Sequence, residues 1–215
     1  MDYSYDGNYM VVVTGANTVV VYDTINYFTQ VTYTPAPGTA KVARFSRNNT
    51  IIAVGQTNGL VVLLSGQPPF NAIPLTSFTP KTGTDQISDL DFSYDGNKMV
   101  VCYSNNNNFQ IIDNWGLTSR TTRDRATGQK QKACQWSPID DVCVVNDNKE
   151  VSIFAIPTSP TAIPSSTSKI TSASADFTDC SIRPTTTPPI KIVVTGGNNA
   201  QKDSSYFLNT GGTLN

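Results

Sequence analysis

The chain has 215 residues and a nearly balanced charge, with 15 lysines and arginines against 16 acidic residues, and only 14% of its residues are charged. This balance argues against a general affinity for nucleic acid or anionic lipid. The chain contains no histidine. A zinc site and a histidine-based acid–base centre are therefore not expected.

No apolar run approaches the length of about 18 residues that a membrane helix needs. Residues Met1 to Ser4 lack the basic and then apolar start of a signal peptide. We therefore expect a protein of the cytoplasm or one associated with the cytoskeleton, and an extracellular protein only if the chain is a fragment that lacks its signal sequence.

One unit recurs along the chain about every 40 to 45 residues. Each copy has an aromatic residue, a tight turn and an apolar strand, and a further strand follows. In Phe92 to Asn97, FSYDGN, the Asp-Gly pair is a strong hairpin signal because such turns need positive φ. The aromatic residue occurs at Tyr3, Phe45, Phe92, Trp136 and Phe177.

The apolar runs after these turns predict the inner strands of each repeat. The second strands are expected at Tyr9 to Thr14, Ile51 to Gly55, Met99 to Tyr103, Val142 to Val145 and Ile190 to Thr195. The third strands are expected at Val19 to Asp23, Leu60 to Leu64, Phe109 to Asp113, Val151 to Ile156 and Tyr206 to Asn209. Thr29 to Tyr33 is the clearest outer strand. A period of this length with several short strands per repeat is typical of β-propeller blades.

We therefore predict an all-β fold, a single β-propeller domain with about five four-stranded blades. The predicted blades are residues 1–40, 41–86, 87–131, 132–170 and 171–215. The chain opens on the innermost strand of its first unit and stops after the third strand of its fifth, so neither end supplies the strand that usually closes a ring. We expect an arc of a larger ring, completed by a further chain or segment, with a compact five-bladed ring as the alternative.

The fifth unit departs from the pattern. An insertion with prolines separates Phe177 from the strand that begins near Ile190, and residues 196–205 predict a long loop. The segment Pro157 to Lys169 is rich in Pro, Ser and Thr, which suits an extended outer strand or, as a second reading, a glycosylated linker. One sequon, Asn48 to Thr50, lies in a predicted turn.

The turn sequence of Phe92 to Asn97 followed by an apolar strand, and the third strands Val19 to Asp23 and Gln110 to Asp113, resemble those of WD-repeat propellers. The segment Val11 to Thr24 also resembles the related YVTN propeller repeats. The resemblance spans nearly the whole chain and implies four-stranded blades. It says little about function, because propellers include scaffolds, lectins and enzymes.

The repeats diverge from the WD pattern. There is no Gly-His pair, and the Trp-Asp pair appears only as Tyr22-Asp23 and Ile112-Asp113. The hydrogen-bonded tetrad that the resemblance would imply must therefore be absent or replaced.

Three kinds of chemical site are considered and set aside. Asp and Gly are adjacent in the turns at residues 4–7 and 93–96, unlike the boxes of sialidase-like propellers, so these are hairpin turns. The glycine-rich loops lack the pattern of a phosphate-binding loop. A calcium site at Asp89 and Asp91, near Asp85 and Asp95, is weighed against solvated acids at turns and strand ends, and the latter is preferred. No catalytic residue, cofactor or metal is predicted.

The four cysteines, Cys102, Cys134, Cys143 and Cys180, form no C-x-x-C pair. Most lie in predicted strands, so buried free thiols are expected. A disulfide between Cys134 and Cys143 is the alternative.

The strongest charge feature is the segment Arg120 to Lys132, expected to cover an outer strand and the loop to the next blade on the partner-binding face. Its candidate contacts for an acidic segment of another protein are Arg120, Arg123, Arg125, Lys130 and Lys132. The alternative is a solvated edge that prevents aggregation.

Loops between the second and third strands would lie on the same face. Their asparagines could bind peptides or sugars, or could serve the turns themselves. The candidates are Asn58, Asn105, Asn106, Asn107 and Asn148.

The sequence therefore favours a non-enzymatic scaffold and component of a larger assembly that binds proteins through the loops of a propeller. The alternative is a secreted or cell-surface propeller that binds carbohydrate or has a structural role, supported by the Ser, Thr and Asn content and the sequon. A propeller hydrolase is the weakest hypothesis.

Overall fold

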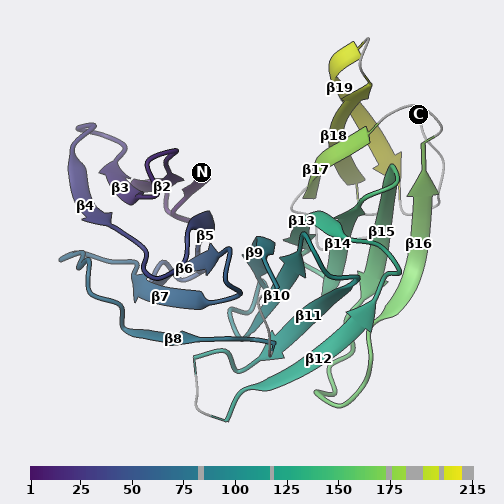
Figure 1. The fold of residues 1–215 in the computed structure, drawn as a ribbon, viewed down its shortest axis with the longest axis horizontal. Helices are drawn as coiled ribbons and strands as arrows, with labels where there is room; N and C mark the ends of the chain where they lie inside the picture. Colours follow the sequence, from purple (N-terminus) through teal and green to yellow (C-terminus); the bar gives the residue numbers. More distant parts are fainter. Residues whose placement is uncertain (82–84, 117–118, 173–175, 183–190, 199–200, 210–215) are drawn as a thin grey trace.

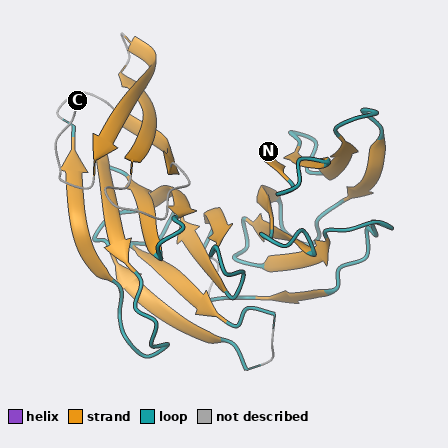
Figure 2. Cartoon of the chain, turned by 180° about the vertical axis from the view of Figure 1, so that it is seen from behind, coloured by secondary structure: helices purple, strands orange, loops and turns teal. Residues whose placement is uncertain are grey.

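The computed structural model describes residues 1–215 apart from 82–84, 117–118, 173–175, 183–190, 199–200 and 210–215. The described residues form β-strands, turns and loops without a helix (Figure 2). Accordingly, no helix in the described part of the chain is long and apolar enough to span a membrane.

Five antiparallel sheets follow one another along the chain, and each is a meander of consecutive strands. The first sheet contains β1 (Asp2–Tyr3), β2 (Tyr9–Val13), β3 (Val19–Asp23) and β4 (Thr29–Tyr33). The second contains β5 (Ala40–Phe45), β6 (Ile51–Gln56), β7 (Val61–Ser65) and β8 (Thr76–Phe78). The third contains β9 (Ile87–Phe92), β10 (Lys98–Tyr103), β11 (Asn108–Asp113) and β12 (Thr121–Ala126). The fourth contains β13 (Gln131–Trp136), β14 (Asp141–Asn146), β15 (Glu150–Ala155) and β16 (Ser165–Thr171). The fifth has β17 (Asp176–Ile182), β18 (Lys191–Asn198) and β19 (Gln201–Asn209).

The sheets are the blades of a propeller, numbered here one to five, and they are arranged as an open arc (Figure 1). The first strands of neighbouring blades, β5 with β9, β9 with β13 and β13 with β17, lie in contact along the inner edge. The first and fifth blades lie at opposite ends of the arc in both views (Figures 1 and 2). The alternative of a compact five-bladed ring is therefore wrong for this structure, since the described residues of blade five do not pack on blade one.

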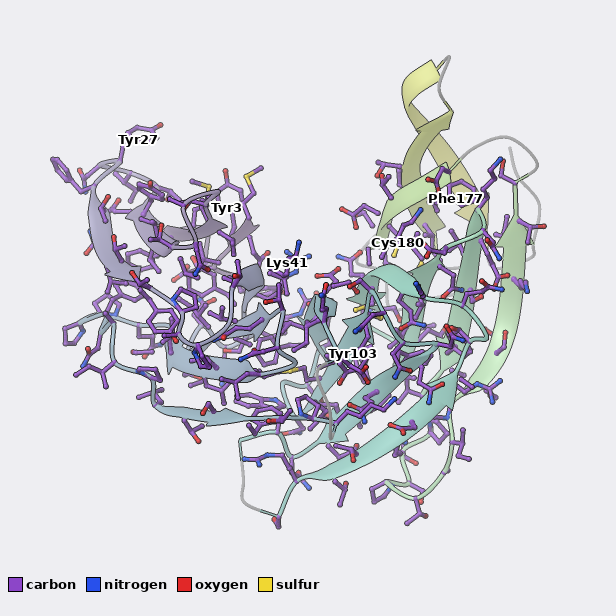
Figure 3. All side chains as sticks on the ribbon, viewed as in Figure 1. Tyr3, Tyr27, Lys41, Tyr103, Phe177 and Cys180 are labelled. Carbon is purple, nitrogen blue, oxygen red and sulfur yellow. The ribbon has the colours of Figure 1, made fainter. Side chains whose placement is uncertain are left out.

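Apolar side chains fill the spaces between blades. Between blades two and three, Ala53, Val61 and Leu63 pack with Met99 and Val101, and all are buried. This explains why the second and third strands are apolar on both sides: each face of a middle blade meets a neighbour. Figure 3 shows the labelled Tyr103 within this packed interior.

A repeated serine turn explains the recurring sequence pattern. In blade three the Ser93 hydroxyl donates to Asp95, and it accepts the Lys98 N–H at 2.8 Å. Gly96 adopts a φ of 74°, which a glycine tolerates without strain. Ser4, Ser46 and Ser137 accept the equivalent N–H of Tyr9, Ile51 and Asp141. The pattern is thus a turn that closes the first hairpin of a blade.

Replacing Ser93 with alanine is expected to destabilise the protein by about 1–3 kcal/mol, because the buried hydroxyl is lost and the Lys98 N–H loses its acceptor. Urea unfolding curves of the variant and the wild type measure the difference. Ser104→Ala is the control, since Ser104 is exposed and its hydroxyl bonds only at 3.5 Å. Equal costs for the two variants would contradict this role of Ser93.

The predicted second and third strands of blades one to four are confirmed to within a residue or two of their ends, and the predicted outer strand Thr29 to Tyr33 is β4. In blade four the outer strand is Ser165–Thr171 and therefore begins eight residues later than the Pro157 to Lys169 segment suggested. The fifth unit was misaligned: Phe177 lies near the start of β17, and Ile182, at its end, takes the place of Phe92 and Trp136. The predicted loop at residues 196–205 is also wrong, because β18 and β19 pair as far as Asn198 and Gln201. Backbone pairing in a hairpin does not need apolar side chains. The predicted proline-containing insertion lies largely at residues 183–190, outside the described residues.

The four cysteines are free and buried, as expected. Cys134 pairs with Val144 across β13 and β14, so Cys143, one residue away, points to the opposite face of the sheet. Cys134 packs toward blade three and Cys143 toward blade five. The alternative of a Cys134–Cys143 disulfide is therefore wrong.

Candidate interaction surface on the loop face

The blades present two rims. The loop face carries the turns between second and third strands, residues 14–18, 57–60, 104–107 and 147–149, together with the connections between blades. The turn face carries the serine turns and the connections between third and outer strands. Antiparallel meanders place these segments alternately at the two ends of the strands, as expected from the sequence.

Hydrogen bonds tie the loop-face turns to the connections beside them. The Thr57 N–H donates to Thr39 O at 2.9 Å, and the Thr127 N–H donates to Asn107 O at 2.8 Å. Between blades, the Ala40 N–H donates to the Asn17 side chain at 2.9 Å. The loops therefore form a connected surface rather than separate flexible tips.

The candidate asparagines mostly serve this network. The Asn58 side chain accepts the Leu60 N–H at 3.2 Å, and that of Asn105 accepts the Gln86 N–H at 2.7 Å. The Asn106 side chain donates to the Asp85 carboxylate at 2.7 Å. Asp85 is one of the acids near the calcium site considered from the sequence, and this bond uses one of its oxygens. These contacts favour the turn-forming role of the amides.

Three of the candidate asparagines, Asn105, Asn107 and Asn148, are exposed and also make hydrogen bonds within the loop face. Asn148 has a φ of 65° and donates to the Gln129 side chain at 2.8 Å. Asn107 bonds Thr127 through its backbone carbonyl. Both residues are exposed, as is Asn105. The amide side chains of these three asparagines are therefore the candidate amides that another molecule can reach on the loop face.

The basic segment does not form a single patch. β12 runs from the turn face to the loop face, so Arg120 lies at one end and Lys130 near the other. Arg120 stacks over the Phe78 ring at 4.3 Å and donates to Trp115 O. The expectation that all five cations share the partner-binding face is therefore wrong, because the strand spans the full height of the blade.

Arg123 is buried, and both of its terminal guanidinium nitrogens donate hydrogen bonds. Its guanidinium pairs with Asp113 at 2.9 Å and donates to the carbonyls of Pro157, Ser159 and Ala162 at 3.0–3.1 Å. It thereby joins the outer part of blade three to the loop that precedes the outer strand of blade four. With 5% of its surface exposed, Arg123 has no free face for a partner.

The other three cations differ in their contacts and in their exposure to solvent. Arg125 lies over the Phe154 ring of the next blade at 5.6 Å. Lys132 pairs with Asp147 at 3.6 Å and with Asp176 of blade five. Lys130 is exposed and lies in the connection from β12 to β13. Of the five predicted cations, Lys130 is the one on the loop face that is most open to another molecule.

Buried charges on the inner strands were underestimated from the sequence. Asp89 and Asp91 are not solvated, since both are buried and hydrogen-bonded between blades. Asp89 accepts from Arg44 of blade two at 2.9 Å and from the Cys134 N–H of blade four at 3.0 Å. Asp91 accepts the Trp136 N–H at 2.8 Å. Asp89 and Asp91 are two residues apart on β9, so their side chains lie on the same side of the strand, and this spacing was the signal in the sequence for a shared environment.

These contacts determine the electrostatics of the inner edge. Burial raises the pKa of Asp89 to about 6, although the Arg44 guanidinium and the Cys134 N–H lower it. Burial likewise raises the pKa of Asp91. No group of three potential ligands suited to a metal is present among the described residues. Each carboxylate oxygen of Asp89 and Asp91 already accepts at least one N–H donor, from a neighbouring strand or from the residue that follows.

The sequence matches no protein-family model and no curated protein. Many solved structures are similar in fold, and three of them are described below. A chain of the mitotic checkpoint complex has a TM-score of 0.74 and 17% identity, over 99% of this chain and 62% of that one. The Myceliophteria thermophila Cps50 (Swd1) β-propeller domain has a TM-score of 0.73 and 12% identity, over 100% and 70%. A functionally unknown protein from Desulfotomaculum acetoxidans has a TM-score of 0.78 and 16% identity, over 100% and 69%.

The chain therefore spans 62% to 70% of the lengths of these three chains. At these identities the similarity shows the fold alone. Together with the five successive meander sheets, it identifies the architecture of this chain as a β-propeller.

Proposed function

We propose that this protein is a non-enzymatic scaffold of the WD-repeat type that binds partner proteins through its loop face, as a component of a larger assembly. The observation that supports this most is the hydrogen-bonded network of loop-face turns and connections. Because these loops are ordered before binding, little conformational entropy is lost when a partner docks.

The chemistry of the exposed side chains suggests the kind of partner. Lys130 supplies a positive charge on a connection that is hydrogen-bonded to the turns of Asn107 and Asn148, through Thr127 and Gln129. Such a site suits an acidic segment of a protein with backbone groups to bond. Similar propellers also occur in protein complexes, as in the mitotic checkpoint complex. A cytoplasmic or cytoskeletal setting is part of the same proposal.

The test is the association of the full chain with proteins from its own cell. Tagged wild type, Lys130→Glu and Gln67→Glu are recovered from the cell and their bound proteins are quantified by mass spectrometry. Gln67 is the matched control because it is exposed beyond β7 on the turn face, and its side chain makes no hydrogen bond to the described residues.

We expect Lys130→Glu to lower the recovery of at least one partner by roughly tenfold, while Gln67→Glu leaves it unchanged. Both variants should unfold at the wild-type urea concentration. If every partner of the wild type is recovered equally with Lys130→Glu, the loop-face proposal fails.

A further inference from the structure

The four cysteines form two pairs, and each pair spans an interface between neighbouring blades. Cys134 and Cys180 both lie two residues before the end of the first strand of their blade, β13 and β17. Cys134 packs in one apolar cluster with Cys102 of β10, and Cys180 packs in another with Cys143 of β14. A cysteine of one blade therefore faces a cysteine of the next at two successive interfaces.

The pair of Cys143 and Cys180 lies between blades four and five. The Cys180 thiol donates to the Cys143 carbonyl at 3.8 Å, and the two thiols are themselves within hydrogen-bonding contact. The buried side chains around them are apolar and include Val145, Phe177 and Val194. Figure 3 labels Cys180 at this interface. Two cysteines in such contact are placed for a direct sulfur–sulfur bond.

Burial protects these thiols while blade five is docked on blade four. Cys143 is 0% exposed and Cys180 is 6% exposed. The hydrogen bond with Cys143 and burial raise the pKa of the Cys180 thiol, so little of the reactive thiolate is present. Cys180 is the more accessible of the two, and its blade is the last of the arc (Figure 1). Reaction should therefore begin at Cys180 when blade five opens.

The second pair, Cys102 with Cys134, provides a comparison within the same chain. These thiols are 0% and 3% exposed, and their interface contains a charge-assisted bond in which the buried Asp89 accepts the Cys134 N–H. Between blades four and five, an inner-strand bond is made by a neutral side chain, since Gln135 accepts the Ile182 N–H. Blade five should therefore open from blade four more readily than blade four opens from blade three.

We propose that Cys143 and Cys180 form a site of reversible oxidation, at which a hydroperoxide converts the two thiols into a disulfide bond that joins blade four to blade five. The two cysteines are 37 positions apart in the chain. A disulfide between them closes this segment and so disfavours separation of the two blades. The inference goes beyond the proposed scaffold function and does not use the loop face.

The reaction balances with hydrogen peroxide as the oxidant. The Cys180 thiolate attacks one oxygen, the O–O bond breaks, and the leaving hydroxide takes up the thiol proton to give water. The Cys143 sulfur then attacks the sulfenic acid of Cys180, the S–O bond breaks, and a second water leaves with the Cys143 proton. The two thiols thus lose two electrons, which reduce the peroxide to water. A dithiol such as dithiothreitol reverses the change by thiol–disulfide exchange.

The test treats the purified full chain with hydrogen peroxide for increasing times, blocks the remaining thiols with iodoacetamide and identifies linked peptides by mass spectrometry without reduction. A protease that cleaves before aspartate separates Cys134 from Cys143, because Asp140 and Asp141 lie between them. The variants are Cys143→Ala and Cys102→Ala, which are matched because each removes one fully buried thiol of an interblade pair. Backbone hydrogen exchange of β17 is measured before oxidation, after it and after addition of dithiothreitol.

We expect a peptide that links Cys143 to Cys180 in the wild type and in Cys102→Ala, formed roughly tenfold faster than a link between Cys102 and Cys134. In Cys143→Ala, Cys180 should form no link and should instead be labelled by dimedone as a sulfenic acid. Amide exchange in β17 should slow roughly tenfold or more after oxidation and recover with dithiothreitol. Lys130→Glu should form the same link, so failure of the loop-face proposal is distinguishable from failure of this one.

Three results would overturn the inference. The first is the absence of a link between Cys143 and Cys180 in the wild type while the chain remains folded in peroxide. The second is an equal rate of linking for the pair of Cys102 and Cys134. The third is hydrogen exchange in β17 that oxidation leaves unchanged. The first and third results come from the wild type, so they do not depend on how the variants fold.

Discussion

Replacement of Arg123 by leucine should lower the free energy of unfolding by about 3–5 kcal/mol, because it leaves the buried carboxylate of Asp113 without its cation. The three carbonyls of Pro157, Ser159 and Ala162 lose their donor as well. Chemical denaturation measures the change. The loop at residues 157–162 should in addition become more sensitive to limited proteolysis.

Two further variants test the cause of this effect. Lys130→Leu removes an exposed cation from the same segment and should change stability by no more than about 0.5 kcal/mol. The double variant Arg123→Leu with Asp113→Leu should cost less than the sum of the single changes, because the buried charge pair is removed as a unit. A cost of Arg123→Leu equal to that of Lys130→Leu would contradict a structural role for this arginine.

Replacement of Asp89 by leucine should also cost about 3–5 kcal/mol, since Arg44 loses its partner and the Cys134 N–H loses its acceptor. Asp89→Asn keeps one acceptor oxygen and should be less harmful. The partly exposed pair of Asp147 with Lys132 provides the control, and Asp147→Leu should cost no more than about 1 kcal/mol. Urea unfolding of the three variants ranks these effects.

The titration of Asp89 gives the same prediction a pH dependence. Burial raises its pKa from 3.8 to about 6 in the folded protein, so within this range the folded state binds its proton more tightly than the unfolded state. The contribution of Asp89 to stability is therefore greatest below pH 3.8, falls as the pH rises toward 6 and is constant above that. The difference between wild type and Asp89→Asn, measured from pH 4 to 7, should show this decline. A flat difference curve would contradict it.

The sequence predicted the blades well because their signal is local. Turns such as Ser93 to Asn97 need specific residues at fixed positions, and inner strands such as Met99 to Tyr103 need apolar residues on both sides. The fifth blade was the exception. Phe177 was taken as the residue before the turn because it is aromatic, but that position requires only an apolar side chain, and Ile182 supplies it.

The candidate surface was harder to predict, because charge in a sequence does not reveal which partners lie nearby in space. Arg123 and Lys130 belong to the same basic segment, yet one is buried against Asp113 and the other is exposed. The carbonyls that bind Arg123 come from the next blade, more than 30 residues later. Likewise, Asp89 and Asp91 are predicted to be solvated until the neighbouring strands that bury them are known.

Hydrogen bonds between the inner strands of neighbouring blades affect how the chain folds. In these bonds a side chain of one inner strand accepts a backbone N–H of the next, as Asp2 accepts that of Phe45 and Asp89 accepts that of Cys134. They join residues 43 to 47 positions apart, about one blade in each case. Each blade can therefore form its meander first and then dock on the preceding one, and every docking step closes a segment of similar length at a similar entropic cost. Such a chain can fold progressively during translation, from the first blade onward, without waiting for a contact between its distant ends.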